Sequence, residues 1–211
     1  MAFKGWPATA LEFYEGLEAD NSKAYWTEHK ATYEKDVRAP MEALLVDLAD
    51  EFGEGHLYRP YRDIRFSPDK SPYKTNIAAG VGSYGYLHLS VDGLVTGAGM
   101  YHMANDQLDR YRRAVVDDKT GPALESIVAG LAAQKIEVHA FEALKTAPKG
   151  YPRDHPRVEL LKKKGLVAMK EWPVAAWLGT AAAKTRIVEV LRAAHPLTDW
   201  LENHVGPSTS T

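Results

Sequence analysis

Residues 76–103 read NIAAGVGSYGYLHLSVDGLVTGAGMYHM, and this stretch decides the fold class. Three runs within it have the composition of β-strands: 76–83, 86–91 and 94–103. The pair Asp92-Gly93 between the last two runs is typical of a two-residue hairpin turn. Because strands joined by so short a turn run antiparallel, we expect an antiparallel β-sheet here.

Helical periodicity surrounds this block on both sides. Apolar residues recur at helical spacing before residue 53 and after residue 104, Pro40 predicts a break or restart, and a further strand is predicted over 58–66. Runs of helices around a contiguous set of antiparallel strands indicate an α+β fold. We expect a single domain over 1–205, in which the sheet packs with N-terminal and C-terminal helices, followed by a flexible tail over 206–211.

Composition excludes several classes of protein. The chain has 211 residues, of which 45% are hydrophobic and 26% are charged, as in an ordinary globular protein. It contains no cysteine, which excludes a disulfide scaffold, an iron–sulfur site and a cysteine nucleophile. No stretch approaches the roughly 20 apolar residues of a membrane span, and the N-terminus lacks the apolar core of a signal peptide. We therefore expect a cytoplasmic protein with no membrane partner, and no cofactor is indicated.

The segment 59–74, called here the basic loop, concentrates positive charge. It reads RPYRDIRFSPDKSPYK, with five basic and two acidic residues, and its prolines restrict the shape of the chain. Arginine offers a planar pair of hydrogen-bond donors and lysine a point charge, so the loop predicts an anion site. Its candidate ligand-binding residues are Arg62, Arg65, Lys70, Tyr73 and Lys74, and Asp63 is a candidate catalytic residue. The alternative is a solvated loop whose charges form only surface ion pairs.

A second basic segment lies at 145–164, with seven basic and two acidic residues. Its glycine and prolines make it irregular and stiff, which is typical of loops that carry function. His155 can titrate near neutral pH beside Asp154, so it is the first candidate for proton transfer, and Lys149 is a candidate ligand contact. The alternative is that Asp154 and His155 only begin the helix that follows Pro156.

Two features outside these segments bear on a site. Arg112 falls near the edge of the apolar face of a predicted helix, so it is either a side chain that reaches out to solvent or an inward-pointing anion ligand. Gly97 and Gly99 leave one face of the predicted hairpin bare, so that either a helix or a ligand can approach the sheet closely there.

The run RDIRFSPDKSPYKT at 62–75 resembles the signature of DUF2461, a family of proteins of unknown function. Other matching pieces follow the order found in that family. They are Asn21 with Trp26, Lys30 and Tyr33; residues 97–101; Leu108 with Arg112; and residues 148–151 with 154–156. The resemblance covers about residues 3–205, and it implies a single-domain α+β layout and a set of motifs but no reaction. At Tyr25-Trp26 this chain departs from the family, which more often has tryptophan followed by phenylalanine.

Together, the two basic segments predict a small anionic ligand that carries a phosphate, nucleotide or carboxylate group and binds in one shared pocket. Whether the protein is an enzyme stays open; if it is, His155 or Asp63 would move protons. The alternative is a module that binds nucleic acid or another protein through the same segments, with steep salt dependence. The net charge of −2 argues against nucleic acid. No spacing indicates a metal site, and the sequence leaves the ligand, the reaction and the oligomeric state undetermined.

Overall fold

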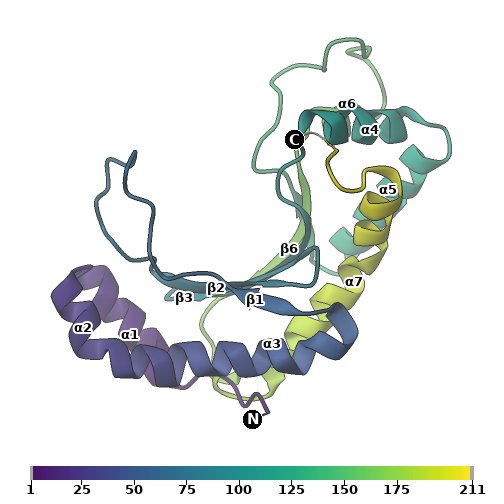
Figure 1. Ribbon diagram of the computed structural model, residues 1–211. Coiled ribbons are helices and arrows are strands. Elements are labelled where there is room, and N and C mark those ends of the chain that lie inside the picture. Colours follow the sequence, from purple (N-terminus) through teal and green to yellow (C-terminus); the bar gives the residue numbers. More distant parts are fainter. Residues whose placement is uncertain (1, 210–211) are drawn as a thin grey trace. The chain divides into compact units, whose positions relative to one another are not determined.

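The computed structural model describes residues 2–209, and it confirms the α+β prediction (Figure 1). In chain order the elements are α1 (Ala8–Ala19), α2 (Lys23–Thr32), the π-helix η1 (Tyr33–Arg38), α3 (Ala39–Phe52), β1 (Gly55–Leu57), β2 (Asn76–Val81), β3 (Gly85–Ser90), β4 (Gly93–Met100), α4 (Asn105–Val116), α5 (Thr120–Ala133), β5 (Glu137–His139), α6 (Val158–Leu161), β6 (Leu166–Trp172), the 3₁₀ helix η2 (Ala176–Gly179) and α7 (Ala182–His204). Within the described residues the strands form an antiparallel sheet of order β1-β2-β3-β4-β6-β5.

The chain divides into two compact units. The first unit holds the described residues up to Thr96 together with Glu171–Glu189, and the second holds Gly97–Lys170 together with the described residues from Val190 onward. Strands β4 and β6 and helix α7 each run from one unit into the other. The expectation of a single domain over 1–205 stays a prediction, and each unit is described here by itself.

In the first unit, helices α1 to α3 lie along strands β1 to β3 (Figure 1). Strand β2 pairs antiparallel with β1 and β3, and its register places Ile77 opposite Leu89 and Ala79 opposite Leu87. These side chains are buried, as is Leu48 of α3. Burying a leucine or isoleucine contributes about 1.5–3 kcal/mol, so this helix–sheet contact is a main source of the unit's stability.

Of the break or restart predicted at Pro40, the break is wrong and the restart is confirmed: Pro40 lies in the first turn of α3, and the helix continues through it. Proline cannot donate a backbone hydrogen bond, and its ring crowds the carbonyl four residues earlier. The six residues Tyr33–Arg38 widen into a π-helix just before it, so that Ala39 N–H donates to the carbonyl of Glu34, five residues back. The wider turn lets α2, η1 and α3 run on without interruption.

The predicted strand over 58–66 is also wrong. The chain there is irregular, and an isolated bridge between Tyr61 and Tyr73 joins the two ends of the loop. Pro60 has no backbone donor for a ladder, and Asp69 accepts hydrogen bonds from its own loop, at Ser71 N–H and Ser71 Oγ. Phe66 consequently points into solvent, with 94% of its surface exposed.

The hairpin forms between the predicted strands, but its turn lies one residue earlier than expected. Strand β3 ends at Ser90 and β4 begins at Gly93, so Val91 and Asp92 make the turn. Gly93 has a φ of +124°, and a Cβ there would lie 2.0 Å from the carbonyl oxygen of Trp172. The glycine is therefore required by the close approach of the chain beyond β6.

The bare positions at Gly97 and Gly99 are filled by strand β6 and not by a helix or a ligand. A Cβ on Gly99 would lie 2.2 Å from the carbonyl oxygen of Leu166, and one on Gly97 would lie 2.9 Å from that of Ala168. Backbone occupies the space that the missing side chains leave, so this predicted site is withdrawn.

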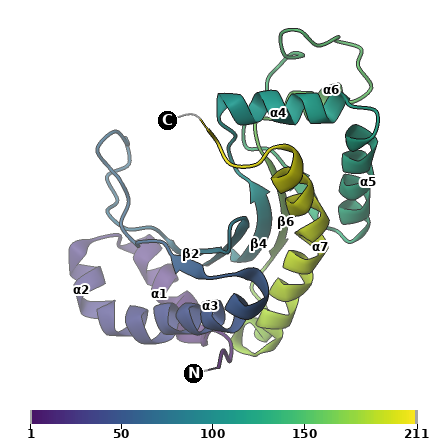
Figure 2. The same cartoon turned by 45° about the vertical axis from the view of Figure 1, so that its right-hand side comes forward.

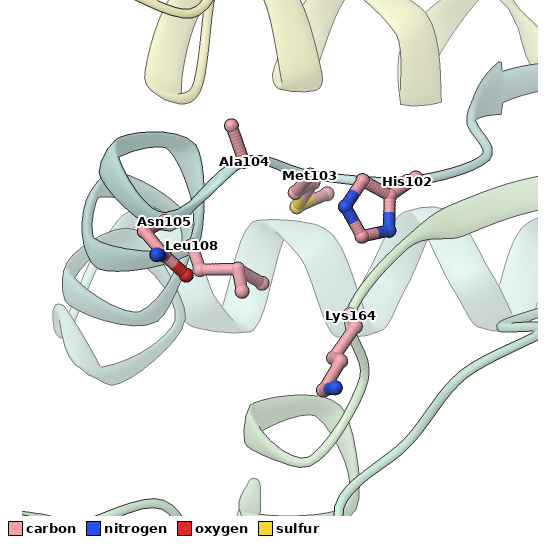
Figure 3. A pocket seen from close by; sticks show the side chains of 6 residues that line it. All are labelled: His102, Met103, Ala104, Asn105, Leu108 and Lys164. Atoms are coloured by element: carbon pink, nitrogen blue, oxygen red, sulfur yellow. The ribbon is translucent and has the colours of Figure 1, made fainter. Parts of the chain in front are cut away.

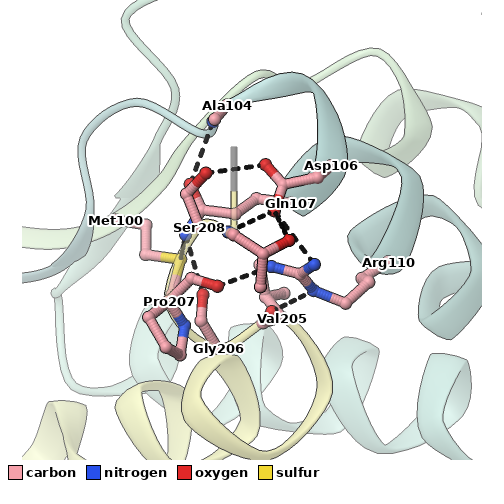
Figure 4. A network of polar contacts seen from close by, with 10 residues as sticks. Met100, Ala104, Asp106, Gln107, Arg110, Val205, Gly206, Pro207 and Ser208 are labelled. Carbon is pink, nitrogen blue, oxygen red and sulfur yellow. Dashed lines mark hydrogen bonds and ion pairs between the residues drawn. The ribbon is translucent and has the colours of Figure 1, made fainter. Parts of the chain in front are cut away.

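In the second unit, residues 206–209 lie against the start of α4 (Figures 2 and 4). Gln107 Nε2 donates to the carbonyl of Gly206 at 2.7 Å, and Arg110 Nη2 donates to that of Pro207 at 2.7 Å. Asp106 accepts from Ser208 Oγ and from Thr209 N–H, both at 2.8 Å. The predicted flexible tail at 206–211 stays a prediction, because these contacts concern its first four residues and positions 210–211 lie outside the described residues.

Replacing Asp106 by asparagine is expected to loosen residues 206–209 from α4. The Thr209 N–H, the Ser208 and Thr209 hydroxyls and Arg110 hold the pKa of Asp106 well below its ordinary value. A lowered carboxyl pKa stabilises the contact above the unfolded-state pKa, and this stabilisation is lost only as the pH falls through the folded-state value. Asparagine removes the charged acceptor at every pH, so hydrogen exchange at the Thr209 amide should become faster.

The matched control is Asp109→Asn on the same helix, because Asp109 is exposed and makes no hydrogen bond or ion pair with any residue in 2–209. This variant should leave the Thr209 amide as protected as in the parent protein. Equal exchange at Thr209 in the parent protein and in Asp106→Asn would contradict the prediction.

Candidate functional site

The two arginines at the centre of the basic loop are paired within the loop itself. Arg65 Nε and Nη2 donate to the two carboxylate oxygens of Asp63 at 2.9 and 2.7 Å, and Arg62 pairs with Asp69. The Arg65 side chain and backbone hold the pKa of Asp63 below its ordinary value, so Asp63 is ionised at neutral pH. These ion pairs offset the charge of both guanidinium groups, and they connect parts of the loop to one another.

Asn21 ties the end of the basic loop to the turn between α1 and α2. Its side-chain Nδ2 donates to the carbonyl of Tyr73 at 3.1 Å, and its Oδ1 accepts from the Tyr73 N–H at 3.1 Å. The Tyr73 ring stacks on Trp26 with a centroid distance of 4.3 Å and an angle of 5°. Of the two lysines predicted here, Lys70 Nζ donates to the carbonyl of Ile64, and Lys74 Nζ lies 5.8 Å from the centre of the Tyr58 ring.

A pocket of about 320 Å³ lies in the first unit, between the α2–η1 helix and the start of the basic loop. It is called here the aromatic pocket. Its lining residues are Trp26, Lys30, Tyr33, Glu34, Arg38 and residues 57–61. Its volume is at the small end of the roughly 300–1,000 Å³ range of ligand sites. Of the predicted site residues, Tyr73 supports this pocket from behind Trp26, and Lys74 approaches the lining ring of Tyr58.

The π-helix supplies one wall of the aromatic pocket. Tyr33, Glu34 and Arg38 all belong to η1, and π-helical turns occur mostly as short insertions, often at functional sites. Arg38 is held between two carboxylates, with Nη1 at 3.2 Å from Glu34 and Nε at 2.8 Å from Glu42. Its charge is therefore offset before any ligand arrives.

Two cations of the aromatic pocket are not offset in this way. Lys30 and Arg59 are exposed, and neither makes a hydrogen bond or ion pair with a residue in 2–209. Arg59 contributes to the lowered pKa of Asp63, but the carboxylate oxygens of Asp63 already accept from Arg65. The pocket thus combines aromatic walls with two positive charges that are available to a ligand.

Tyr33 can add a neutral hydrogen-bond donor to these charges. Burial raises the pKa of its phenol to about 12, with Arg38 opposing that shift and Glu34, Glu42 and Tyr61 adding to it. Three of these four neighbours also line the aromatic pocket, which places the phenol among the pocket's charged groups. The hydroxyl therefore keeps its proton throughout the physiological range and can donate a hydrogen bond.

One protein-family model matches most of the chain. Residues 9–200 match the model of a family described as "Conserved hypothetical protein (DUF2461)". The chain belongs to the DUF2461 family. The matched region includes the whole basic loop and every residue of the aromatic pocket. No curated protein and no solved structure matches this DUF2461 chain.

The remaining predicted site residues of the DUF2461 chain lie in its second unit. His155 Nδ1 accepts from the Arg157 N–H at 3.0 Å, and the His155 carbonyl accepts from Val158, the first residue of α6. Both contacts lie just before α6, whose N-cap residue, Arg157, has no side-chain cap hydrogen bond. Arg112 Nε donates to the carbonyl of Leu161 at 3.4 Å, and Lys149 is exposed. The roles of these residues, and a pocket shared with the basic loop, stay predictions.

A second pocket, of about 330 Å³, lies at the start of α4 (Figure 3). Its lining residues are His102, Met103, Ala104, Asn105, Leu108 and Lys164. Lys164 Nζ lies 3.2 Å from a carboxylate oxygen of Glu142, so its charge is offset. Met103 and Leu108 are buried apolar side chains of the core. This pocket offers fewer available charges than the aromatic pocket.

The described part of the chain lacks two features, a metal-binding cluster and a membrane-spanning helix. Among residues 2–209, no group of three or more histidine, aspartate or glutamate side chains is placed to hold a metal ion. No helix in that range is both long and apolar enough to cross a membrane.

Sequence reasoning missed Lys30 and Arg59 as candidate contacts. Arg59 contributes to the charge of the basic loop but is not among the predicted contacts, and Lys30 is named only beside Trp26 and Tyr33 as part of the family resemblance. A signal for Lys30 is nevertheless present there, because these three residues line the aromatic pocket together. The tertiary contact between α2 and the loop, some 30 residues later in the chain, could not be found from spacing.

Proposed function

We propose that this DUF2461 chain binds a small anionic ligand in the aromatic pocket, with Lys30 and Arg59 as its principal contacts. The observation that supports the proposal is that both cations line one pocket and neither forms an ion pair with a carboxylate among residues 2–209. A phosphate or carboxylate would satisfy both. Arg59 can donate two parallel hydrogen bonds to such a group, and Lys30 supplies a point charge.

Three further features support an anion at this place. Lys74 approaches the pocket through the ring of Tyr58, which adds a third positive charge nearby. The Tyr33 hydroxyl stays protonated and can donate a hydrogen bond. The basic loop is held by its own ion pairs and by Asn21, so little ordering is needed when a ligand binds.

Lys30→Ala and Arg59→Ala are each expected to weaken binding of the best anionic probe by about tenfold or more, since a hydrogen bond to a charged group contributes about 1.5–3 kcal/mol. The probe is found by thermal shift with inorganic phosphate, adenosine monophosphate (AMP), ribose 5-phosphate, phenyl phosphate, benzoate and citrate. Isothermal titration calorimetry then measures the dissociation constants.

Lys23→Ala is the matched control, because Lys23 is an exposed lysine of the same helix that does not line the pocket. It should bind the probe as the parent protein does. The proposal is wrong if no probe binds, or if the Lys30 and Arg59 variants bind as tightly as Lys23→Ala. Binding of a single-stranded oligonucleotide with steep salt dependence, but of no small probe, would favour the nucleic-acid alternative instead.

A further inference from the structure

The aromatic pocket exposes flat rings as well as charge. Tyr61 keeps 51% of its surface exposed and Tyr58 keeps 38%, although each is a large ring on the wall of a pocket. Leaving such rings in water forgoes the free energy that their burial would release. An aromatic side chain that stays open at the wall of a pocket is available to a ligand.

The ring of Tyr61 lies against two other aromatic rings. Its centroid lies 6.2 Å from that of Trp26 and 5.5 Å from that of Tyr73, at angles of 47° and 43°. Trp26 and Tyr73 are buried, so they form a fixed base for the exposed ring. Tyr61 therefore joins a buried aromatic cluster while it keeps surface open to the pocket.

The backbone around Tyr61 is fixed as well. Pro60 restricts the backbone just before it, the bridge to Tyr73 holds it in register, and Asn21 anchors Tyr73 through two hydrogen bonds. A ring that is already in place loses little conformational entropy when a ligand stacks on it. The arrangement is that of a preformed stacking surface.

Charge and ring come from the same short segment. Arg59 lies two residues before Tyr61, and Lys30 comes from the facing helix α2, so a ligand that pairs with these cations lies beside the exposed rings. The pocket volume of about 320 Å³ suits one small molecule rather than a polymer.

We infer that the ligand of this pocket is an aromatic anion: a single flat ring system, such as a nucleobase or phenyl group, that carries a phosphate or carboxylate. The inference rests on the proposed function, because it names the chemical class of the ligand bound at the same site. The anionic group pairs with Lys30 and Arg59, and the ring stacks on Tyr61. An anion without a ring makes only the first set of contacts.

The test compares matched probes that share the anionic group. AMP and ribose 5-phosphate differ by the base, and phenyl phosphate and inorganic phosphate differ by the ring. Benzoate and acetate form the corresponding carboxylate pair, and comparing this pair with the phosphate pairs shows which anionic group the pocket prefers. The aromatic member of at least one pair should bind about tenfold more tightly or better, since stacking of a base on an aromatic side chain contributes about 1–3 kcal/mol.

Variants of Tyr61 test whether stacking on this ring causes the tighter binding of aromatic probes. Tyr61→Leu should reduce the ratio of affinities between the aromatic and non-aromatic probes to about one, and Tyr61→Phe should keep the ratio because it keeps the ring. Phe66→Leu is the matched control, since Phe66 is an exposed aromatic residue of the same loop outside the pocket. Thermal unfolding shows whether each variant is folded.

The possible results distinguish a failure of the aromatic-anion inference from a failure of the proposed anion-binding function. If the non-aromatic probes bind as tightly as their aromatic partners, or if folded Tyr61→Leu keeps the preference, the inference is wrong although the anion site stands. If no probe binds, or if Lys30→Ala and Arg59→Ala have no effect, the proposed function fails and the inference fails with it.

Discussion

Trp26→Ala is expected to lower the free energy of unfolding by about 3–5 kcal/mol, the usual cost of truncating a buried aromatic residue to alanine. Only 6% of Trp26 is exposed, and its ring stacks on Tyr73 and lies 4.7 Å from Tyr33 and 5.7 Å from Phe13. Each such pair adds stability beyond the area that it buries. The truncation leaves a cavity between helix α2 and the end of the basic loop.

Chemical denaturation measures this loss. Trp26→Phe keeps a ring in contact with Tyr73 and should lose less stability than the alanine variant. Phe66→Ala truncates an aromatic ring that is 94% exposed, so it should change the stability by no more than about 0.5 kcal/mol. A loss in Trp26→Ala as small as that in Phe66→Ala would show that the aromatic cluster does not hold the loop.

Gly99→Ala is expected to cost about 3–5 kcal/mol, as the sum of backbone strain and overpacking. Gly99 has a φ of +145°, which L-residues rarely adopt, and its added Cβ would lie 2.2 Å from the carbonyl oxygen of Leu166. That oxygen belongs to the backbone of β6 and cannot rotate away. The methyl group therefore requires β4 and β6 to separate, and poor soluble expression is the expected result in cells.

Gly150→Ala separates the two contributions. Gly150 also has a positive φ, of +89°, but nothing lies within 4 Å of its added Cβ. The free energy of unfolding of this variant should fall only by the cost of the unfavourable backbone conformation, about 1–2 kcal/mol. If chemical denaturation gives equal losses for the two variants, the close contact between β4 and β6 does not contribute to the cost.

Neighbouring residues along the chain were enough to predict the fold class. Asp92 and Gly93 lie between apolar runs, and a tight turn between such runs specifies an antiparallel pair wherever it occurs. The turn itself lies one residue earlier, and Gly93, the first residue of β4, closely approaches the carbonyl oxygen of Trp172. That approach joins segments about 80 residues apart, and no local pattern encodes it.

The helix through Pro40 and the irregular basic loop show a similar limit. Pro40 alone leaves a break or a restart open, and the π-turn in the preceding six residues lets the helix continue into α3 without a break. The local sequence alone predicts a strand over 58–66, whereas the carboxylates of Asp63 and Asp69 accept hydrogen bonds within their own loop. In both places local hydrogen bonds replace those of a regular α-helix or β-strand. The difference in free energy between the two arrangements is too small to be predicted from the amino-acid composition.

For the candidate site, the amino-acid sequence was sufficient to locate excess positive charge, because charge is a property of each residue on its own. Which charges remain available depends on partners brought together by folding. Arg62 and Arg65 are paired inside their loop, while Lys30 and Arg59 meet at one pocket from a helix and a loop that are distant in the chain. Pairing depends on distances of a few ångströms between side chains, and those distances exist only once α2 packs against the loop.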